Sequence, residues 1–292
     1  MSALAPLAYA AGWQLARYVP RVVLARLFQL GADLAAVRDG PGARRLRRNL
    51  ARVVPRATPA ELDVLVRDAL RSYARYWQEI FTLPAADRAA LAAAVDAGLH
   101  GIEHVNAAMA AGRGVIVALP HSGNWEMAGV WLVERHGTFS TIAERLAPEW
   151  LYQRFAAYRA ALGFEVLPLT GAENPIPRLL RRLRAGGVVC LLADRDLTGS
   201  GVVVDFFGGP ARMPSGPARL AAATGATLLV LGCWFTPDGW GFRVHPPVPV
   251  PDRSAVHQAT QLVADRFAKD IAAHPQDWHM VQPLWLDDLA RG

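Results

Sequence analysis

The sequence has 292 residues, of which 52% are hydrophobic, and its formal net charge at pH 7 is +6. That length fits one large domain or two small ones, and the apolar content exceeds the roughly 45–50% usual in soluble domains. The only two cysteines, Cys190 and Cys233, lie inside apolar runs, which excludes a disulfide framework and indicates buried thiols in a reducing compartment.

The positive charge comes almost entirely from arginine. Lys269 is the only lysine among the 31 basic residues. Because arginine binds phosphate through a bidentate fork, we expect a surface that meets phosphate, in nucleic acid, a cofactor or a lipid headgroup. Nucleic acid is disfavoured, since no recognised binding motif accompanies the charge.

The N-terminal segment is apolar and carries several aromatic residues. Arg17, Arg21 and Arg26 interrupt it too early for a membrane-spanning helix of about 20 apolar residues, and no positive charge precedes it as in a signal peptide. A basic cluster follows, formed by Arg44, Arg45, Arg47, Arg48 and Arg52. This pattern favours helices that lie on a bilayer containing anionic lipids. A core-packing N-terminal helix and a solvated basic helix face remain alternatives.

Helices and strands alternate over most of the remaining chain. Thr58 as N-cap, Pro59 at the first helical position and Glu61 at the third predict a helix that ends near Phe81. Further helices are expected at 102–111, 125–135, 149–162, 177–185, 214–224 and 254–273. Strands are expected at 115–119, 139–143, 164–169, 188–193, 202–206, 227–235 and 241–248.

This alternation predicts an α/β fold with a largely parallel or mixed central β-sheet flanked by helices. We interpret residues 1–292 as one domain. Residues 1–82 would be mainly helical and membrane-associating, and residues 101–292 would form the α/β catalytic core.

His121 follows the buried strand at 115–119, and Glu126 lies five residues later. Ligands of open α/β sheets bind beyond the carboxyl ends of strands, which is where His121 is expected. The two side chains can meet only if His121 precedes a helix that has Glu126 in its first turn. Ser122 or Asn124 can cap such a helix.

Two interpretations of this pair stay open. One is a polar strand-end histidine beside an exposed glutamate favoured by the helix dipole. The other is a dyad in which His121 is a general base and Glu126 holds the imidazole tautomer. A zinc site would need a second His or Cys close by, and none is present, so no metal is expected.

Charged clusters follow other strands. Glu144 and Arg145 come after the strand at 139–143, with Arg154 and Arg159 on the next helix. Asp194–Arg195–Asp196 follows the strand at 188–193, and packing alone explains three charges there poorly. Arg212–Pro217 opens a helix whose N-terminus can hold an anion. The alternative for each cluster is a solvated loop or a mutual ion pair.

The stretch Pro120–His121–Ser122–Gly123–Asn124–Trp125–Glu126 resembles the His-x4-Asp/Glu motif of bacterial lipid acyltransferases related to the late acyltransferases of lipid A synthesis. Further stretches are similar to the actinobacterial phosphatidylinositol mannoside acyltransferases. They are Glu144–Arg145–Leu146 with Tyr158–Arg159, Leu167–Pro168–Leu169–Thr170–Gly171, Asp194–Arg195–Asp196–Leu197–Thr198, Asp205–Phe206–Phe207–Gly208 and Asp277–Trp278–His279–Met280. The resemblance covers nearly the whole chain.

The resemblance implies an acyl-CoA-dependent O-acyltransferase of α/β fold, associated peripherally with the cytoplasmic face of the cell membrane. It implies transfer of a long-chain acyl group, such as that of palmitoyl-CoA, to a mannose 6-hydroxyl of a phosphatidylinositol mannoside, with acyl-CoA as co-substrate and no other cofactor. Carried over, His121 is the base and Glu126 the acid of the motif, a position where the mannoside branch more commonly has aspartate. The candidate substrate-binding residues are Ser122, Asn124, Glu144, Arg145, Arg159, Asp194, Arg195 and Asp196.

The residues themselves agree with direct acyl transfer. No Gly-x-Ser-x-Gly elbow is present that would suggest an acyl-serine intermediate. Three alternatives remain: a lipid A-type acyltransferase acting on another glycolipid, a hydrolase of acyl-CoA or lipid esters, and a non-catalytic lipid-binding protein.

Overall fold

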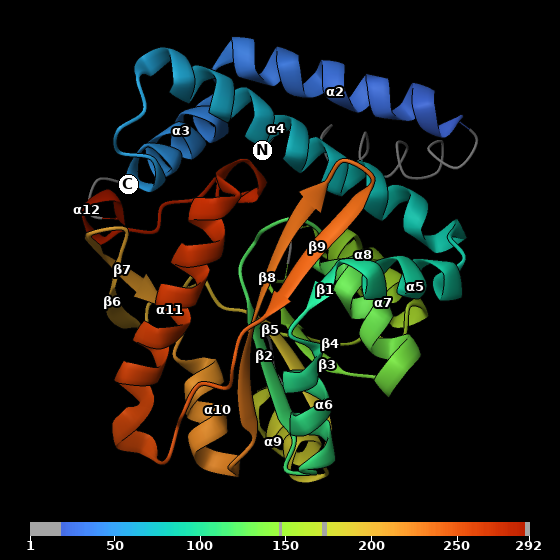
Figure 1. Cartoon of the computed structure of the whole chain (residues 1–292), viewed down its shortest axis with the longest axis vertical. Coiled ribbons are helices and arrows are strands. Elements are labelled where there is room, and N and C mark those ends of the chain that lie inside the picture. The colour runs from blue at the N-terminus through green and yellow to red at the C-terminus, as the bar shows by residue number, and fades with distance from the viewer. Residues whose placement is uncertain (1–18, 146–147, 171–173, 290–292) are drawn as a thin grey trace.

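The computed structural model describes residues 19–145, 148–170 and 174–289, and its centre is a seven-stranded β-sheet with helices on both faces (Figure 1). The strand order is β1-β9-β8-β2-β5-β3-β4, with β9 antiparallel to β8 and the other neighbours parallel. A separate antiparallel pair consists of β6 and β7. The strands are Leu99–His100 (β1), Val115–Leu119 (β2), Ser140–Ala143 (β3), Glu165–Pro168 (β4), Val188–Leu192 (β5), Val202–Phe206 (β6), Gly209–Met213 (β7), Thr227–Thr236 (β8) and Gly239–Val244 (β9).

Within the described residues, helices occupy both ends and most connections between strands. They are Arg21–Arg38 (α2), Pro41–Val53 (α3), Pro59–Thr82 (α4), Arg88–Gly98 (α5), Ile102–Ala110 (α6), Trp125–His136 (α7), Glu149–Ala161 (α8), Ile176–Arg184 (α9), Gly216–Thr224 (α10), Val256–Ala273 (α11) and Leu286–Leu289 (α12). The expected α/β fold with a largely parallel sheet is confirmed.

The central strand β2 is buried on both faces, which explains its unbroken apolar sequence. Successive residues of a strand point to opposite faces. Val115, Val117 and Leu119 therefore pack with α5, α6 and α7. Ile116 and Ala118 pack with α9, α10 and α11 on the other face. The two hydrophobic cores are thus separated by the sheet.

The chain leaves β2 and β5 toward opposite faces of the sheet. The helix after β2 is α7, which belongs to the first core, whereas α10, which follows β5 after the β6–β7 pair, belongs to the second. Adjacent parallel strands whose connections part in this way open a crevice at their carboxyl ends. The loops that follow β2 and β5 border this crevice.

Several elements differ from the sequence prediction. Helix α5 and strands β1 and β7 were not predicted, and the strand expected at 241–248 begins at Gly239 and ends at Val244. The helix expected from residue 214 begins at Gly216. The reason is that Arg212 and Met213 pair with β6 as the end of β7.

Helices α2, α3 and α4 form the N-terminal part, and α2 runs across α4 at one end of the molecule (Figure 1). The predicted capping box of Thr58 and Glu61 is present at the start of α4. Arg71 of α4 forms a bidentate pair with Asp33 of α2, at 2.6 and 2.9 Å. Within the described residues, every helix is too short or too polar to cross a bilayer. Residues 1–16, part of the expected membrane segment, lie outside the described residues.

Candidate active site

The pairing of β2 with β5 brings His121 and Asp194 together. These strands are parallel neighbours in which Leu119 is paired with Leu192. Each of the two polar residues lies two positions beyond that pair, so the register places them opposite each other at the crevice.

Asp194 is fully buried and holds the His121 ring. Its Oδ1 lies 2.6 Å from His121 Nδ1, and its Oδ2 accepts the backbone N–H of His121 at 2.9 Å. Burial alone would raise the pKa of Asp194, but the His121 ring and the hydrogen bonds lower it below its usual value. An ionised carboxylate can only accept hydrogen bonds, so His121 carries its proton on Nδ1. The lone pair of Nε2 is then available as a base.

Glu126 is not the partner of His121, contrary to the sequence prediction. It lies in the first turn of α7, as expected, with Asn124 as the N-cap. Its fully buried Oε1 accepts hydrogen bonds from Arg159 on α8, at 2.7 Å from Nη2 and 3.2 Å from Nε. Although burial acts in the opposite direction, the Glu126 charge raises the pKa of Arg159. Asp194 therefore orients the imidazole, while Glu126 neutralises Arg159.

Replacing Glu126 with glutamine should lower the free energy of unfolding by about 3–5 kcal/mol, because the Arg159 side chain is only 14% exposed and loses its counter-charge. Chemical denaturation of the purified protein measures this change. As a matched control, Glu149→Gln breaks the exposed ion pair between Arg145 and Glu149 and should leave stability almost unchanged. Equal effects of the two substitutions would contradict the buried pair.

The segment Asp277–His279 holds the His121 loop from behind. The backbone N–H of His279 donates to the His121 carbonyl at 2.8 Å, and the Gly123 N–H donates to the Asp277 carbonyl at 2.9 Å. Trp278 Nε1 donates to Asp194 Oδ2 at 3.1 Å. The motif glycine is required here, since Gly123 has φ +54° and a Cβ would lie 2.8 Å from the backbone nitrogen of Trp234. The sequence contained this segment as a family stretch, but nothing in its pattern revealed these contacts.

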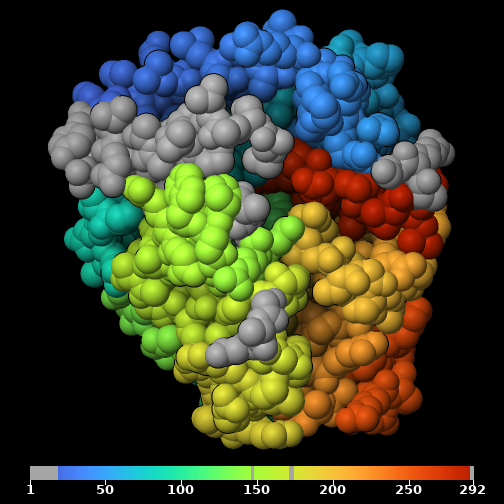
Figure 2. Space-filling view, turned by 180° about the vertical axis from the view of Figure 1, so that it is seen from behind, coloured from blue at the N-terminus to red at the C-terminus, as the bar shows by residue number. Residues whose placement is uncertain are grey.

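Two adjoining pockets, of about 220 and 430 Å³, open beside His121. Both are lined by His121, Trp125, Glu144 and Arg159. The smaller pocket continues toward aromatic side chains of α4 and α8, and the larger one reaches residues 195–201 and the start of α10. The surface is hollowed between the yellow-green and the gold segments (Figure 2), which carry the two sides of the larger pocket. The two pockets therefore meet at His121.

Three other predicted residues line the larger pocket, namely Glu144, Arg195 and Asp196. Arg195 donates to Glu144 at 3.5 Å across it. Asp196 accepts the backbone N–H groups of Thr198 and Gly201, at 2.9 and 2.7 Å. Its carboxylate therefore shapes the turn at this wall.

Four predicted residues, Ser122, Asn124, Arg145 and Asp194, are not among the side chains that line these two pockets. Arg145 forms a surface pair with Glu149, with distances of 2.7 and 2.9 Å. Ser122 is buried and pairs through its backbone with Trp278. Its position agrees with a role in the loop rather than as a nucleophile. Among the described residues there is no group of three or more His, Cys, Asp or Glu side chains that could hold a metal ion.

A separate apolar cavity of about 50 Å³ lies on the α5–α7 face of the sheet. Alternate residues of β2, β5 and β8 form its floor, together with side chains from α5, α6 and α7. Trp125 lines this cavity and also both pockets, so it stands between them. Cys190 lines the cavity as well, and burial raises the pKa of its thiol. An apolar chamber thus adjoins the polar crevice.

Comparison with known proteins agrees with this geometry. The sequence profile of bacterial lipid A biosynthesis acyltransferases matches residues 2–287. The chain belongs to this family. Within it, proteins named phosphatidylinositol mannoside acyltransferase from two strains of Mycobacterium tuberculosis are 55% identical over 284 residues, covering 97% of this chain and 89% of theirs. One of the same name from Mycolicibacterium smegmatis is 53% identical over 285 residues, covering 97% and 92%.

The match confirms the family that the His-x4-Glu motif and the accompanying stretches indicated. The structure shows an arrangement in this member of the family that the motif does not reveal. Its histidine is oriented by Asp194, which lies 73 residues further along the chain. Its glutamate instead holds the cation of Arg159 at the wall of both pockets.

Proposed function

We propose that this acyltransferase moves a long-chain acyl group from acyl-CoA to the mannose 6-hydroxyl of a phosphatidylinositol mannoside, with His121 as the general base. The observation that carries the mechanism is the 2.6 Å contact between Asp194 and His121 Nδ1, at the junction of two pockets. The acceptor is proposed from the names of the relatives from Mycobacterium tuberculosis and Mycolicibacterium smegmatis.

The transfer proceeds without an acyl-enzyme. The acceptor hydroxyl gives its proton to His121 Nε2 as its oxygen attacks the thioester carbonyl carbon. Asp194 stabilises the imidazolium that forms. When the tetrahedral intermediate collapses, the carbon–sulfur bond breaks, and the proton on His121 passes to the departing CoA sulfur.

The apolar cavity supports a lipid substrate. We propose that the acyl chain of the donor passes Trp125 and enters this cavity, since its lining is almost wholly apolar and Trp125 joins it to the crevice. A cavity of about 50 Å³ is small beside a long acyl chain, so the lining side chains must move apart to admit it. Burial of each methylene contributes about 0.8 kcal/mol, which offsets that rearrangement.

The larger pocket also suits a phosphorylated ligand. Arg195 and Arg219 line it, together with Ser215 and Gly216 at the N-terminus of α10. Arginine and a helix N-terminus both favour phosphate. Both substrates carry phosphate, and we assign this pocket to the polar parts that must stay near the reacting groups.

We further propose that the protein binds peripherally to the cytoplasmic face of the membrane through α2. An apolar stripe repeats there at spacings of three and four residues, and each of its side chains is 48–82% exposed. It consists of Val23, Leu27, Leu30, Leu34 and Val37. Arg21, Arg26 and Arg38 of the same helix supply charge that attracts anionic lipid.

Replacing Val23, Leu27, Leu30 and Leu34 with serine should abolish most binding to vesicles that contain anionic phospholipid. Each side chain that no longer enters the interface removes about 1–2 kcal/mol of apolar burial. Sedimentation with vesicles measures the bound fraction, which should also fall in high salt because the arginine attraction is screened. The control Val203→Ser removes an exposed apolar side chain from β6 and should change nothing. Undiminished binding of the fourfold variant would refute the role of α2.

Mass spectrometry of reaction products tests the proposed function. Purified protein is incubated with palmitoyl-CoA and a phosphatidylinositol mannoside, and fragmentation locates the new ester. The expected product carries palmitate on a mannose 6-hydroxyl. Acylation of another glycolipid in preference would support the lipid A-type alternative. Equal release of free fatty acid with and without the acceptor would overturn transfer in favour of hydrolysis.

A further inference from the structure

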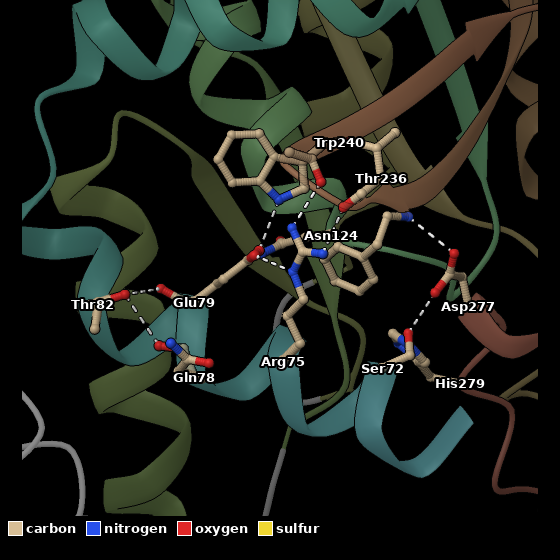
Figure 3. Close-up of polar contacts among 12 residues, drawn as sticks. Ser72, Arg75, Gln78, Glu79, Thr82, Asn124, Thr236, Trp240, Asp277 and His279 are labelled. Carbon is tan, nitrogen blue, oxygen red and sulfur yellow. Dashed lines mark hydrogen bonds and ion pairs between the residues drawn. The ribbon is translucent and has the colours of Figure 1, made fainter. Parts of the chain in front are cut away.

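Helix α4 presents a row of polar side chains to the back of the His121 loop. Ser72, Arg75 and Glu79 are spaced three and four residues apart and therefore share one face of the helix. Ser72 points toward Asp277 and His279, whereas Arg75 and Glu79 point toward the β8–β9 turn and Asn124 (Figure 3). None of them belongs to the His-x4-Glu motif.

Glu79 is the centre of this row. Its Oε2 accepts the side-chain amide of Asn124 at 2.7 Å and the indole N–H of Trp240 at 2.8 Å. Its Oε1 accepts Arg75 Nε at 2.8 Å, and Arg75 in turn donates to the carbonyls of Thr236 and Gly239. The carboxylate is therefore held on three sides, and its side chain is only 14% exposed.

The contact with Glu79 decides which way the Asn124 amide faces. A carboxylate can only accept, so the amide nitrogen of Asn124 must point at Glu79. Its oxygen then points at the backbone N–H of Glu126, which it accepts at 3.1 Å as the N-cap of α7. A reversed amide would present a donor to that N–H and break the cap.

We propose that Glu79 is a positioning residue for acyl transfer, acting through Asn124 to hold the start of α7. The first turn of α7 contains Glu126, and the ion-pair partner of Glu126, Arg159, lines the pockets beside His121. The hydrogen bonds that join the His121 loop to Asp277 and His279 are formed by backbone groups instead. Glu79 thus connects the N-terminal helices to this loop through a side-chain hydrogen bond with Asn124. This inference rests on the proposed function, since the reaction that benefits is acyl transfer at His121.

An exchange of donor and acceptor tests the proposal. Glu79→Gln lets the new amide donate and so permits a reversed Asn124, which should lower kcat roughly 10–100-fold and leave KM for the donor nearly unchanged. Asn124→Asp retains a good cap but places two carboxylates together, and kcat should fall similarly. The double variant pairs a donor at 79 with an acceptor-only cap at 124. Its kcat should exceed that of either single variant, although only part of the loss is recovered, because the new amide nitrogen at position 79 also faces the indole N–H of Trp240.

Hydrogen exchange supplies a readout that does not need activity. Amides of residues 121–126 should exchange faster in each single variant than in the original protein, and more slowly in the double variant than in either single variant. Glu61→Gln is the matched control on the same helix, since it changes the capping box far from the loop and should alter neither kcat nor this exchange.

The outcomes are distinct. Single variants with unchanged kcat and exchange, or a double variant as impaired as the two singles combined, would overturn the positioning role. If the original protein transfers no acyl group, the proposed function fails, and the exchange measurements still decide whether Glu79 positions the loop.

Discussion

Replacing His121 with alanine should lower the rate of acyl transfer by roughly 10²–10⁴-fold, which corresponds to about 3–5 kcal/mol of activation barrier. The proposed base is His121, whose Nδ1 contacts Asp194 and whose ring borders both pockets. With its side chain 38% exposed, its loss leaves no buried cavity, so folding should be retained. Transfer from labelled palmitoyl-CoA at saturating acceptor measures the effect.

His104→Ala is a suitable control, because this histidine on α6 lines neither pocket beside His121 and its Nε2 lies 3.9 Å from the Glu103 carboxylate. The control should keep nearly full activity. A folded His121→Ala protein with a near-normal rate would refute general-base catalysis, and acyl transfer would then need another proton acceptor.

Asp194→Asn should reduce transfer almost as strongly, by roughly 10³–10⁴-fold. Two donors, the His121 backbone N–H and Trp278 Nε1, meet at Oδ2. They fix the amide oxygen of the new side chain at that position, which turns its NH₂ group toward His121 Nδ1. Nδ1 must then accept, so the proton moves to Nε2 and the base is lost.

The rate of Asp194→Asn measured against pH checks this tautomer argument. Because the pKa of Asp194 is lowered in the folded protein, its carboxylate stays ionised at neutral pH. The stability that it contributes is complete above its unfolded pKa of about 3.9 and is lost only as the pH falls through the lower folded pKa. Because the asparagine side chain does not titrate, the reduced rate of the variant should persist across the neutral range. An asparagine variant that regains normal activity at any neutral or alkaline pH would contradict the assigned role.

The sequence predicted those elements whose pattern is local and strong. The apolar run at 115–119 and the capping box at Thr58 are both present. Helix α5 was missed because its alanine-rich sequence has little periodicity. Strand β7 contains Gly209 and Pro210, which argue against a strand, yet it lies in a two-stranded pair with β6 where proline is tolerated.

Asp194 was among the predicted site residues, but it was not predicted as the partner of His121. Spacing along the chain suggested Glu126, whereas the contact is set by the register between β2 and β5. A register is a property of two strands that pair in space, and no local pattern encodes it. Glu79 and Trp278 were given no role for the same reason, since each reaches the site from a distant segment.

The hydrogen bonds from Asp277–His279 to the His121 loop bear on how the site forms while the chain is synthesised on the ribosome. His121 and Asp194 both emerge well before this segment, yet it supplies the bonds to the His121 carbonyl, the Gly123 N–H and the Asp194 carboxylate. A nascent chain therefore carries the reacting groups long before they are fixed in place. We therefore expect the site to be completed only after α11 and the segment that follows it have been made.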